Sequence, residues 1–306
     1  MIQISGFTDE VNGSLDTQIA VAKSLGMHYI CPRVIDGKNI SAYTCDAFLQ
    51  TVKPRLDAAG IGFSSIGSPI GKVGIGDEEG YQAQRKKLKE LVKIATAMNC
   101  KYIRIFSFFV SPKIDYEKAH AIVLRKLKGF LEEVEGTDIV LLHENEKKIY
   151  GDTPERALRL YREIDHPQFK LCYDASNYIQ CKVDPVKAFE MTKEATVYYH
   201  MKDCDRGVEV PLGTGKGHIK ELLADLVKRG YDGFLTLEPH TAKYAVLKHV
   251  FLFVPGLAFT TMGKVFRTID RSMGVGTLQK VSREQVFVWQ HDNLTKMLDE
   301  VGGQYE

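Results

Sequence analysis

The sequence predicts a (β/α)8 TIM barrel of the α/β class, followed by an extended C-terminal segment. Eight short apolar runs alternate with segments of helical periodicity, which favours a parallel barrel over a doubly wound sheet. The last four runs end in Glu144, Asp174, His200 and Glu238, which are separated by 30, 26 and 38 residues. Each interval accommodates one strand, one helix and their loops. Residues that end successive strands of such a barrel lie around one mouth.

The elements follow in strict order. Strands are expected at residues 2–6, 28–31, 62–67, 102–106, 139–144, 170–174, 196–200 and 234–238. Helices are expected between them at residues 14–25, 46–59, 77–98, 116–134, 154–164, 185–192 and 219–228. Ser14 with Asp16, and Thr153 before Pro154, suit helix starts. Gly26 and Gly60 suit helix C-terminal caps. A dinucleotide-binding sheet would need GxGxxG after the first strand, and residues 5–10 do not supply it.

After the eighth strand the pattern changes. Residues 241–282 are apolar and contain glycines, and a closing helix is expected at residues 283–301. Residues 1–240 are therefore assigned to the barrel with its metal site, and residues 241–306 to an extension packed on it within a single domain. Three interpretations of the extension stay open, namely a flap over the mouth, a docking surface for a second subunit, and an irregular packed tail.

The overall composition argues against nucleic-acid and membrane partners. Among 306 residues, 41 basic and 39 acidic side chains give a net charge of +2, without the basic excess of a nucleic-acid binder. The longest apolar run, residues 250–259, is too short for a bilayer and holds Pro255 and Gly256. The N-terminus lacks the pattern of a secretory signal, and the six cysteines form no CxxC pair. Reduced thiols and a cytoplasmic location are therefore expected.

Glu144, Asp174, His200 and Glu238 are the candidate metal ligands. A single acidic residue at a strand end is more often a helix cap, but four such residues in register are a more specific signal. Three carboxylates and one imidazole favour Mn²⁺, with Mg²⁺, Co²⁺ or Zn²⁺ as alternatives. Such an ion, bound to a sugar carbonyl, would make the neighbouring C–H group acidic and stabilise the resulting enediolate.

The candidate catalytic bases are Glu144, Glu238 and His143. Alternation along a strand turns His143 away from Glu144 unless a turn follows the strand end directly. His240, two residues after Glu238, can share its face, and His240 and Lys202 are candidate substrate-binding residues.

The chain resembles the xylose-isomerase-like TIM barrels, often labelled sugar phosphate isomerase/epimerase, over about residues 1–240. The resemblance is strongest in the segments LHEN (142–145), YDASN (173–177), HMKD (200–203), PLGTG (211–215) and GYDGFLTLE (230–238). It implies that the four strand-end residues bind a divalent metal and that the two glutamates move protons. It also implies substrate contacts by Arg206, six residues after the histidine, and by Asn177, where ketose epimerases often have a histidine. Where many members carry a glutamate near the end of strand 2, this chain has Cys31-Pro-Arg33.

Several functions remain open. The resemblance extends to the catalytic subunit of heteromeric C-glycoside deglycosidases, which release the aglycone of a 3-oxo sugar together with a small β subunit. His143, the altered strand 2 and the apolar residues 251–273 favour this lyase reaction on a glycoside. The alternative is an aldose–ketose isomerase or ketose epimerase that assembles only with itself. A metal-dependent endonuclease and a sugar-binding barrel without turnover are two further alternatives.

Overall fold

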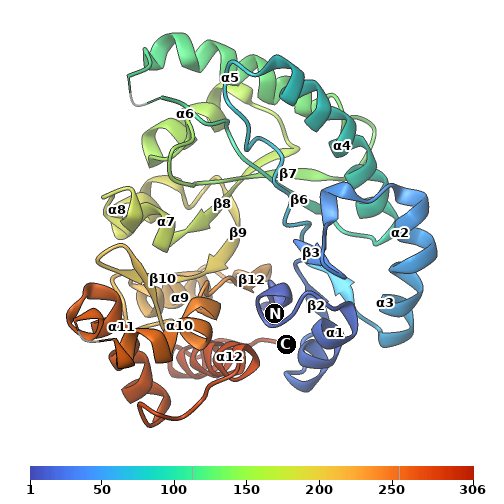
Figure 1. Cartoon of the computed structure of the whole chain (residues 1–306). Helices are drawn as coiled ribbons and strands as arrows, with labels where there is room; N and C mark the ends of the chain where they lie inside the picture. The colour runs from blue at the N-terminus through green and yellow to red at the C-terminus, as the bar shows by residue number, and fades with distance from the viewer. Residues whose placement is uncertain (112, 255) are drawn as a thin grey trace.

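The protein is a TIM barrel, as the sequence predicts. The computed structural model describes residues 1–111, 113–254 and 256–306, so Pro255 of the apolar run lies outside the described residues. Each predicted strand overlaps an observed one (Figure 1). The barrel strands are β1 (Gln3–Gly6), β2 (Tyr29–Ile30), β5 (Gly62–Phe63), β6 (Tyr102–Ile105), β7 (Val140–Glu144), β8 (Phe169–Asp174), β9 (Thr196–Met201) and β12 (Phe234–Leu237).

Backbone hydrogen bonds connect these strands in sequence order around the barrel. Six of them form one parallel sheet in the order β1-β12-β9-β8-β7-β6, and β2 pairs with β5. The N–H group of Cys31 donates to the carbonyl of Gly6 at 2.9 Å, which connects β2 to β1. The N–H group of Ile66 donates to Tyr102 at 2.9 Å, which connects the continuation of β5 to β6. The carboxyl ends of all eight strands therefore lie at one end of the barrel.

Helices cover the outside of the barrel. They are α1 (Leu15–Ser24), α2 (Cys45–Thr51), α3 (Lys53–Ala59), α4 (Glu78–Ala97), α5 (Tyr116–Leu131), α6 (Pro154–Ile164), α7 (Ala175–Gln180), α8 (Pro185–Thr192) and α9 (Ile219–Lys228). The predicted starts and caps are largely confirmed: Thr153 accepts a hydrogen bond from the Arg156 N–H group, and Gly60 adopts φ +69°. Across the described residues, none of the helices has the length and apolar character needed to cross a membrane.

Two sequence predictions about helices are corrected. The single helix expected at residues 46–59 is interrupted at Val52, because Pro54 lacks the N–H group that a continuous helix would bond to residue 50. Ser14 stands at the first cap of α1, but its side chain makes no capping bond. The Asp36 carboxylate accepts from the Leu15 N–H group at 2.9 Å instead. This long-range partner could not be read from local sequence.

Alternation along the strands decides which side chains face the barrel interior. A small apolar cluster of Val140, Leu142, Cys172 and Tyr198 fills the interior. Leu141, Tyr173, Tyr199 and Leu237, which alternate with inward positions, belong to the larger core between the sheet and the helices. Successive side chains of a strand point to opposite faces. Glu144, Asp174 and His200, two residues after Leu142, Cys172 and Tyr198, therefore continue the inward rows toward the mouth.

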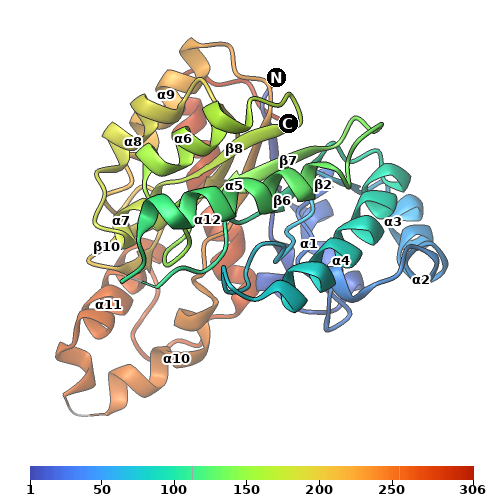
Figure 2. The same ribbon diagram turned by 90° about the horizontal axis from the view of Figure 1, so that it is seen from above.

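The C-terminal extension is helical. It comprises α10 (Ala242–Phe253), the short 3-10 helix η3 (Leu257–Phe259), α11 (Thr261–Met273) and α12 (Arg283–Glu300), so the interpretation as an irregular tail is wrong. Figure 2 shows α10 and α11 projecting beyond the barrel, whereas α12 lies along it. The last residues return to β1, where the Glu306 N–H group donates to Ile2 at 2.9 Å. The chain termini are therefore neighbours (Figure 1).

Sequence patterns did not predict two hairpins. One consists of β3 (Val34–Ile35) and β4 (Lys38–Asn39), and the other of β10 (Asp203–Asp205) and β11 (Val208–Val210). The second hairpin follows β9 directly and stands at the mouth. Their strands have only two or three residues, which is too short for alternation to be recognised.

Candidate metal centre

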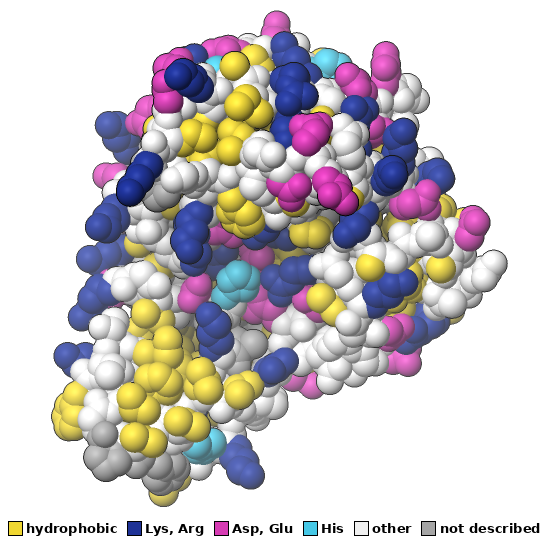
Figure 3. Space-filling view, turned by 45° about the horizontal axis from the view of Figure 1, so that its top comes forward, with side chains coloured by type: hydrophobic (Ala, Val, Ile, Leu, Met, Phe, Trp, Pro, Cys, Tyr) yellow, Lys and Arg dark blue, Asp and Glu magenta, His cyan; other side chains and the backbone are white. Residues whose placement is uncertain are grey.

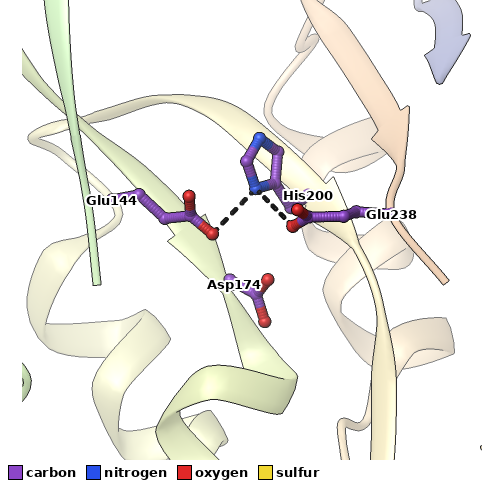
Figure 4. A group of neighbouring side chains, drawn as sticks. All are labelled: Glu144, Asp174, His200 and Glu238. Atoms are coloured by element: carbon purple, nitrogen blue, oxygen red, sulfur yellow. Dashed lines mark hydrogen bonds and ion pairs between the residues drawn. The ribbon is translucent and has the colours of Figure 1, made fainter. Parts of the chain in front are cut away.

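Four side chains meet inside the mouth of the barrel. Glu144 and Asp174 end β7 and β8, His200 lies near the end of β9, and Glu238 follows β12. One ligand atom of each lies within 4.8 Å of the others. Figure 4 shows that all four side chains point into the same space. Each is at most 3% exposed, so the cluster is shielded from bulk water.

The histidine sits between two carboxylates. His200 Nδ1 lies 3.0 Å from Glu144 Oε1 and 3.2 Å from Glu238 Oε2. On the other side, Lys202 Nζ lies 2.8 Å from Asp174 Oδ2 and 3.3 Å from Glu238 Oε2. Positive and negative groups thus alternate, and this arrangement offsets part of the cost of removing the charges from water.

These neighbours determine the charge state of the cluster. Burial would raise the pKa of Glu144, but the charges of His200 and Arg104 lower it to about 2. Burial would lower the pKa of His200, but the adjacent negative groups raise it well above its usual value. Burial raises the pKa of Asp174 to about 6, against the opposing effect of Lys202. The chain's own cations therefore keep the glutamates ionised.

Two arginines that sequence reasoning did not assign to the site complete the cluster. Arg104 on β6 is 5% exposed and its Nη1 lies 3.1 Å from Glu144 Oε2 and 3.4 Å from Glu238 Oε1. Arg33, after β2, places its own Nη1 3.4 Å from the same Glu238 oxygen. A signal for Arg104 was present, since an arginine at an inward position of a short apolar strand has to pair with buried acids.

Asparagines hold the first two carboxylates in place. Asn177 Nδ2 donates to Glu144 Oε1 at 3.1 Å, and its backbone N–H group donates to Asp174 Oδ1 at 2.8 Å. Asn145 exchanges two hydrogen bonds of 2.9 Å with the backbone of Asp174. Asn177, predicted to contact substrate, thus lies in the cluster and orients two of the candidate ligands.

His240 connects the cluster to the surface. Its Nε2 lies 3.3 Å from Glu238 Oε1, and its ring is partly exposed. Burial and the charge of Lys202 would lower the pKa of His240, but Glu238 and Glu209 raise it to about 9. A pocket of about 530 Å³ opens beside it. Figure 3 shows a hollow between the barrel and the C-terminal helices, where basic and acidic side chains gather around a histidine.

His143 and Arg206 do not join the cluster. The His143 ring lies against Phe169 and beside Gly151, on the side of β7 opposite Glu144, as alternation requires. Among the described residues neither of its buried ring nitrogens has a hydrogen-bond partner, and burial lowers its pKa to about 4. Arg206 occupies the turn between β10 and β11, where it is exposed and pairs with Asp205 at 3.0 Å. Their roles in catalysis and substrate binding stay predictions.

The cluster fits a divalent cation. Glu144 Oε2 and Asp174 Oδ2 are buried oxygens with no well-aligned hydrogen bond among the described residues. Each is instead in an ion pair, Glu144 with Arg104 and Asp174 with Lys202. The donor set of three carboxylates and one imidazole is that of Mn²⁺, Mg²⁺ or Zn²⁺ sites. A bound ion would replace the proton on His200, because a nitrogen that binds a metal cannot carry a proton.

Comparison with known sequences identifies the family. The sequence profile of the xylose isomerase-like TIM barrel family matches residues 19–253. The chain belongs to this family. The predicted resemblance is thereby confirmed, whereas that to C-glycoside deglycosidases stays a prediction. A search of curated proteins found no match.

Solved structures share the fold at low sequence identity. A D-tagatose 3-epimerase-like protein has a TM-score of 0.71 and 13% identity, with 98% of both chains covered. The IOLI protein, with a zinc atom bound, has a TM-score of 0.70 and 13% identity, covering 98% of this chain and 99% of that one. The D-allulose 3-epimerase from Methylomonas sp. has a TM-score of 0.68 and 14% identity, covering 97% of this chain and 98% of that one. These likenesses extend over the C-terminal extension as well as the barrel.

Proposed function

We propose that this chain is a divalent-metal-dependent sugar isomerase or epimerase. The observation that carries the proposal is the meeting of Glu144, Asp174, His200 and Glu238 within 4.8 Å at four successive strand ends. Membership of the xylose isomerase-like family supports it, and so do the epimerases among the similar structures. Mn²⁺ is the ion we expect, with Mg²⁺, Co²⁺ or Zn²⁺ as alternatives.

When bound, the divalent ion would act as a Lewis acid that polarises a sugar carbonyl. Glu144 and Glu238 approach the same His200 nitrogen from different strands, at 3.0 and 3.2 Å, so their carboxylates face a common space. Because both are ionised, either can accept the proton of a carbon beside the carbonyl. Returning the proton to the neighbouring carbon gives an isomerase, and returning it to the opposite face gives an epimerase.

Further residues would bind the sugar itself. Lys202 Nζ and the His240 ring are cationic groups beside the glutamates, and both can donate hydrogen bonds to sugar oxygens. Asn177 keeps Glu144 in a fixed orientation through its 3.1 Å bond. The burial of the cluster excludes water, which strengthens these electrostatic interactions.

The isomerase or epimerase reaction is preferred over the lyase reaction that the sequence favoured. Three observations favoured a lyase in the sequence. The first no longer supports it, because His143 lies away from the cluster. The altered strand 2 supplies Arg33 as a partner of Glu238, and the apolar residues belong to helices of the extension, α10 and α11. Release of an aglycone from a 3-oxo glycoside therefore has less support than proton transfer on a ketose.

Solvent exchange tests this proposal across many sugars at once. The Mn²⁺-loaded protein is incubated in D₂O with a panel of ketoses and aldoses, and NMR measures deuterium at the carbon next to the carbonyl. We expect deuterium incorporation together with an epimer or isomer, and no incorporation with Glu144→Gln. A parallel incubation with a 3-oxo C-glucoside, with and without copurifying proteins, tests the lyase. Aglycone release without exchange in any free sugar would contradict the proposal.

A further inference from the structure

The pocket beside the metal cluster is built by both parts of the chain. Its volume is about 530 Å³, and it is lined by Asp9, Glu10, Arg33, His240, Lys243, Val246, Leu247 and Arg283. Arg33 and His240 also touch Glu238 Oε1, at 3.4 and 3.3 Å. A ligand in the pocket would therefore reach the candidate metal ligands directly.

The inner half of the pocket is polar, and its positive and negative side chains pair with one another. Arg33 Nε donates to Asp9 Oδ2 at 2.9 Å, and the backbone N–H group of His240 donates to Glu10 Oε1 at 3.1 Å. The other oxygens, Asp9 Oδ1 and Glu10 Oε2, are buried and accept no hydrogen bond among the described residues. Buried acceptors normally have a partner. Hydroxyl groups of a sugar are donors of the kind that these oxygens lack.

The outer half of the pocket carries unbalanced positive charge. Lys243 in the first turn of α10 and Arg283 at the start of α12 are exposed. In the part of the chain that the structure describes, neither side chain has an ion pair, a hydrogen bond or an aromatic ring as partner. They lie 40 residues apart in sequence, and both line this pocket because α10 packs against α12. Val246 and Leu247 give the same half an apolar wall.

We propose that this pocket selects substrates that carry an anionic group, a phosphate or a carboxylate. Lys243 and Arg283 would bind the anion, while Asp9, Glu10 and Arg33 bind hydroxyl groups nearer the metal centre. Charge-assisted hydrogen bonds from a lysine and an arginine are the usual means of holding phosphate and carboxylate groups. The sugar part of this inference rests on the proposed function, but the anion site can be tested without turnover.

Titration with inorganic phosphate tests the anion site. Calorimetry compares the metal-loaded wild type with the double variant Lys243→Gln/Arg283→Gln. The control Lys86→Gln/Lys87→Gln removes the same charge from the exposed side of α4. We expect the Kd for phosphate to rise at least about tenfold in the first variant and to stay unchanged in the control, with weaker binding at high salt. Two results would overturn the proposal. One is an equal Kd for all three proteins, which is expected if the metal alone holds the phosphate, and the other is no phosphate binding to the wild type.

Kinetics with matched substrates identify the anion. A neutral ketose, its terminal phosphate ester and the corresponding sugar acid are compared. For the anionic substrate that the pocket selects, kcat/KM should be at least about tenfold lower in the double variant than in the wild type. For the neutral ketose, kcat/KM should be the same in both proteins. A preference of the wild type for the neutral ketose would overturn the proposal. If no sugar is turned over, the proposed function fails, and the phosphate titration still decides the anion site.

Discussion

The strand-end cluster and the pocket-lining residues of the C-terminal extension differ in how their charges are balanced. In the cluster, each carboxylate is buried and has a cation within 3.4 Å, from Arg33, Arg104, His200 or Lys202. In the extension, Lys243 and Arg283 are exposed and carry no such partner among the described residues. Buried charges have to be balanced by the fold itself, whereas exposed charges can be left for a ligand.

This difference leads us to expect proton transfer in the cluster and substrate recognition at the extension. The cluster is fixed by the barrel and is shielded from water, which suits proton transfer next to a carbonyl. The extension stands at the rim and adds cations and an apolar wall to the pocket. Substitutions in the cluster should therefore abolish turnover, and substitutions in the extension should alter substrate preference with the metal centre intact.

The largest effect is expected for Glu144→Gln. The amide keeps the shape of the side chain but removes one ligand charge and one candidate base, so turnover should fall by about 10²–10⁴-fold. Metal content, measured by elemental analysis, should fall as well, while circular dichroism shows an intact fold. Glu135→Gln, at an exposed position, is the matched control. Wild-type turnover in Glu144→Gln would remove this residue from the site, and Glu238→Gln tests the opposite carboxylate in the same way.

Arg104→Met should be the most destabilising of the substitutions. It leaves Glu144 and Glu238 without the cation that lies 3.1 and 3.4 Å from them, so the free energy of unfolding should fall by about 3–5 kcal/mol. Because a bound divalent ion stabilises only the folded protein, Mn²⁺ should restore part of this loss. Urea unfolding with and without Mn²⁺ measures both effects. Arg125→Met, at an exposed ion pair, is the control, and a loss that Mn²⁺ leaves unchanged would contradict the assigned role of the cluster.

Lys248→Met should loosen the extension alone. Lys248 is fully buried, pairs with Asp270 at 2.6 Å and donates to the Gly276 carbonyl, so it ties α10 to α11. Its removal should make residues 241–282 sensitive to limited proteolysis, because the remaining Asp270 is buried without its cation. Metal affinity should remain that of the wild type. Loss of the metal together with the extension would show that the two regions fold as one unit.

His143→Gln should have the smallest effect. His143 lies on the face of β7 away from the cluster, and in the described part of the chain its buried nitrogens make no hydrogen bond that the substitution would remove. Metal content should be unchanged and turnover should fall by less than about tenfold, which is below the usual contribution of a general base. A larger fall at constant metal content would support the catalytic role that the sequence suggested for His143.

Sequence periodicity was sufficient for the barrel and for the four candidate ligands. Strand ends meet at one mouth in any such barrel. The spacing of Glu144, Asp174, His200 and Glu238 was therefore enough to predict that these residues lie close together. Alternation also anticipated the position of His143. The same reasoning missed Arg33 and Arg104, because their pairing with Glu238 joins residues more than 130 positions apart.

The extension was the least predictable region. The sequence of α10 is apolar on several sides, so its helical period is weak. α11 does have an amphipathic period, with Val265, Phe266 and Ile269 on its buried face, and sequence reasoning overlooked it within the apolar, glycine-containing segment. The pairing of Lys248 with Asp270 and the presence of Lys243 and Arg283 in one pocket depend on how the helices of the extension pack. An apolar surface also remains at Val246, Val250, Val254 and Phe259, each at least 44% exposed (Figure 3). The interpretations of the extension as a flap or as a docking surface both remain predictions, as does a small partner subunit.

Metal titration of the wild type beside Asp174→Asn is the most direct test of the central claim. Asp174 is fully buried, and a metal-binding role would explain its oxygen that lacks a well-aligned hydrogen bond. Isothermal calorimetry with Mn²⁺, supported by elemental analysis, should give one ion per chain for the wild type and an affinity at least about tenfold weaker for Asp174→Asn. Equal affinity in the two proteins, or no binding of Mn²⁺, Mg²⁺, Co²⁺ or Zn²⁺ to the wild type, would contradict the claim that the four strand ends form a metal centre.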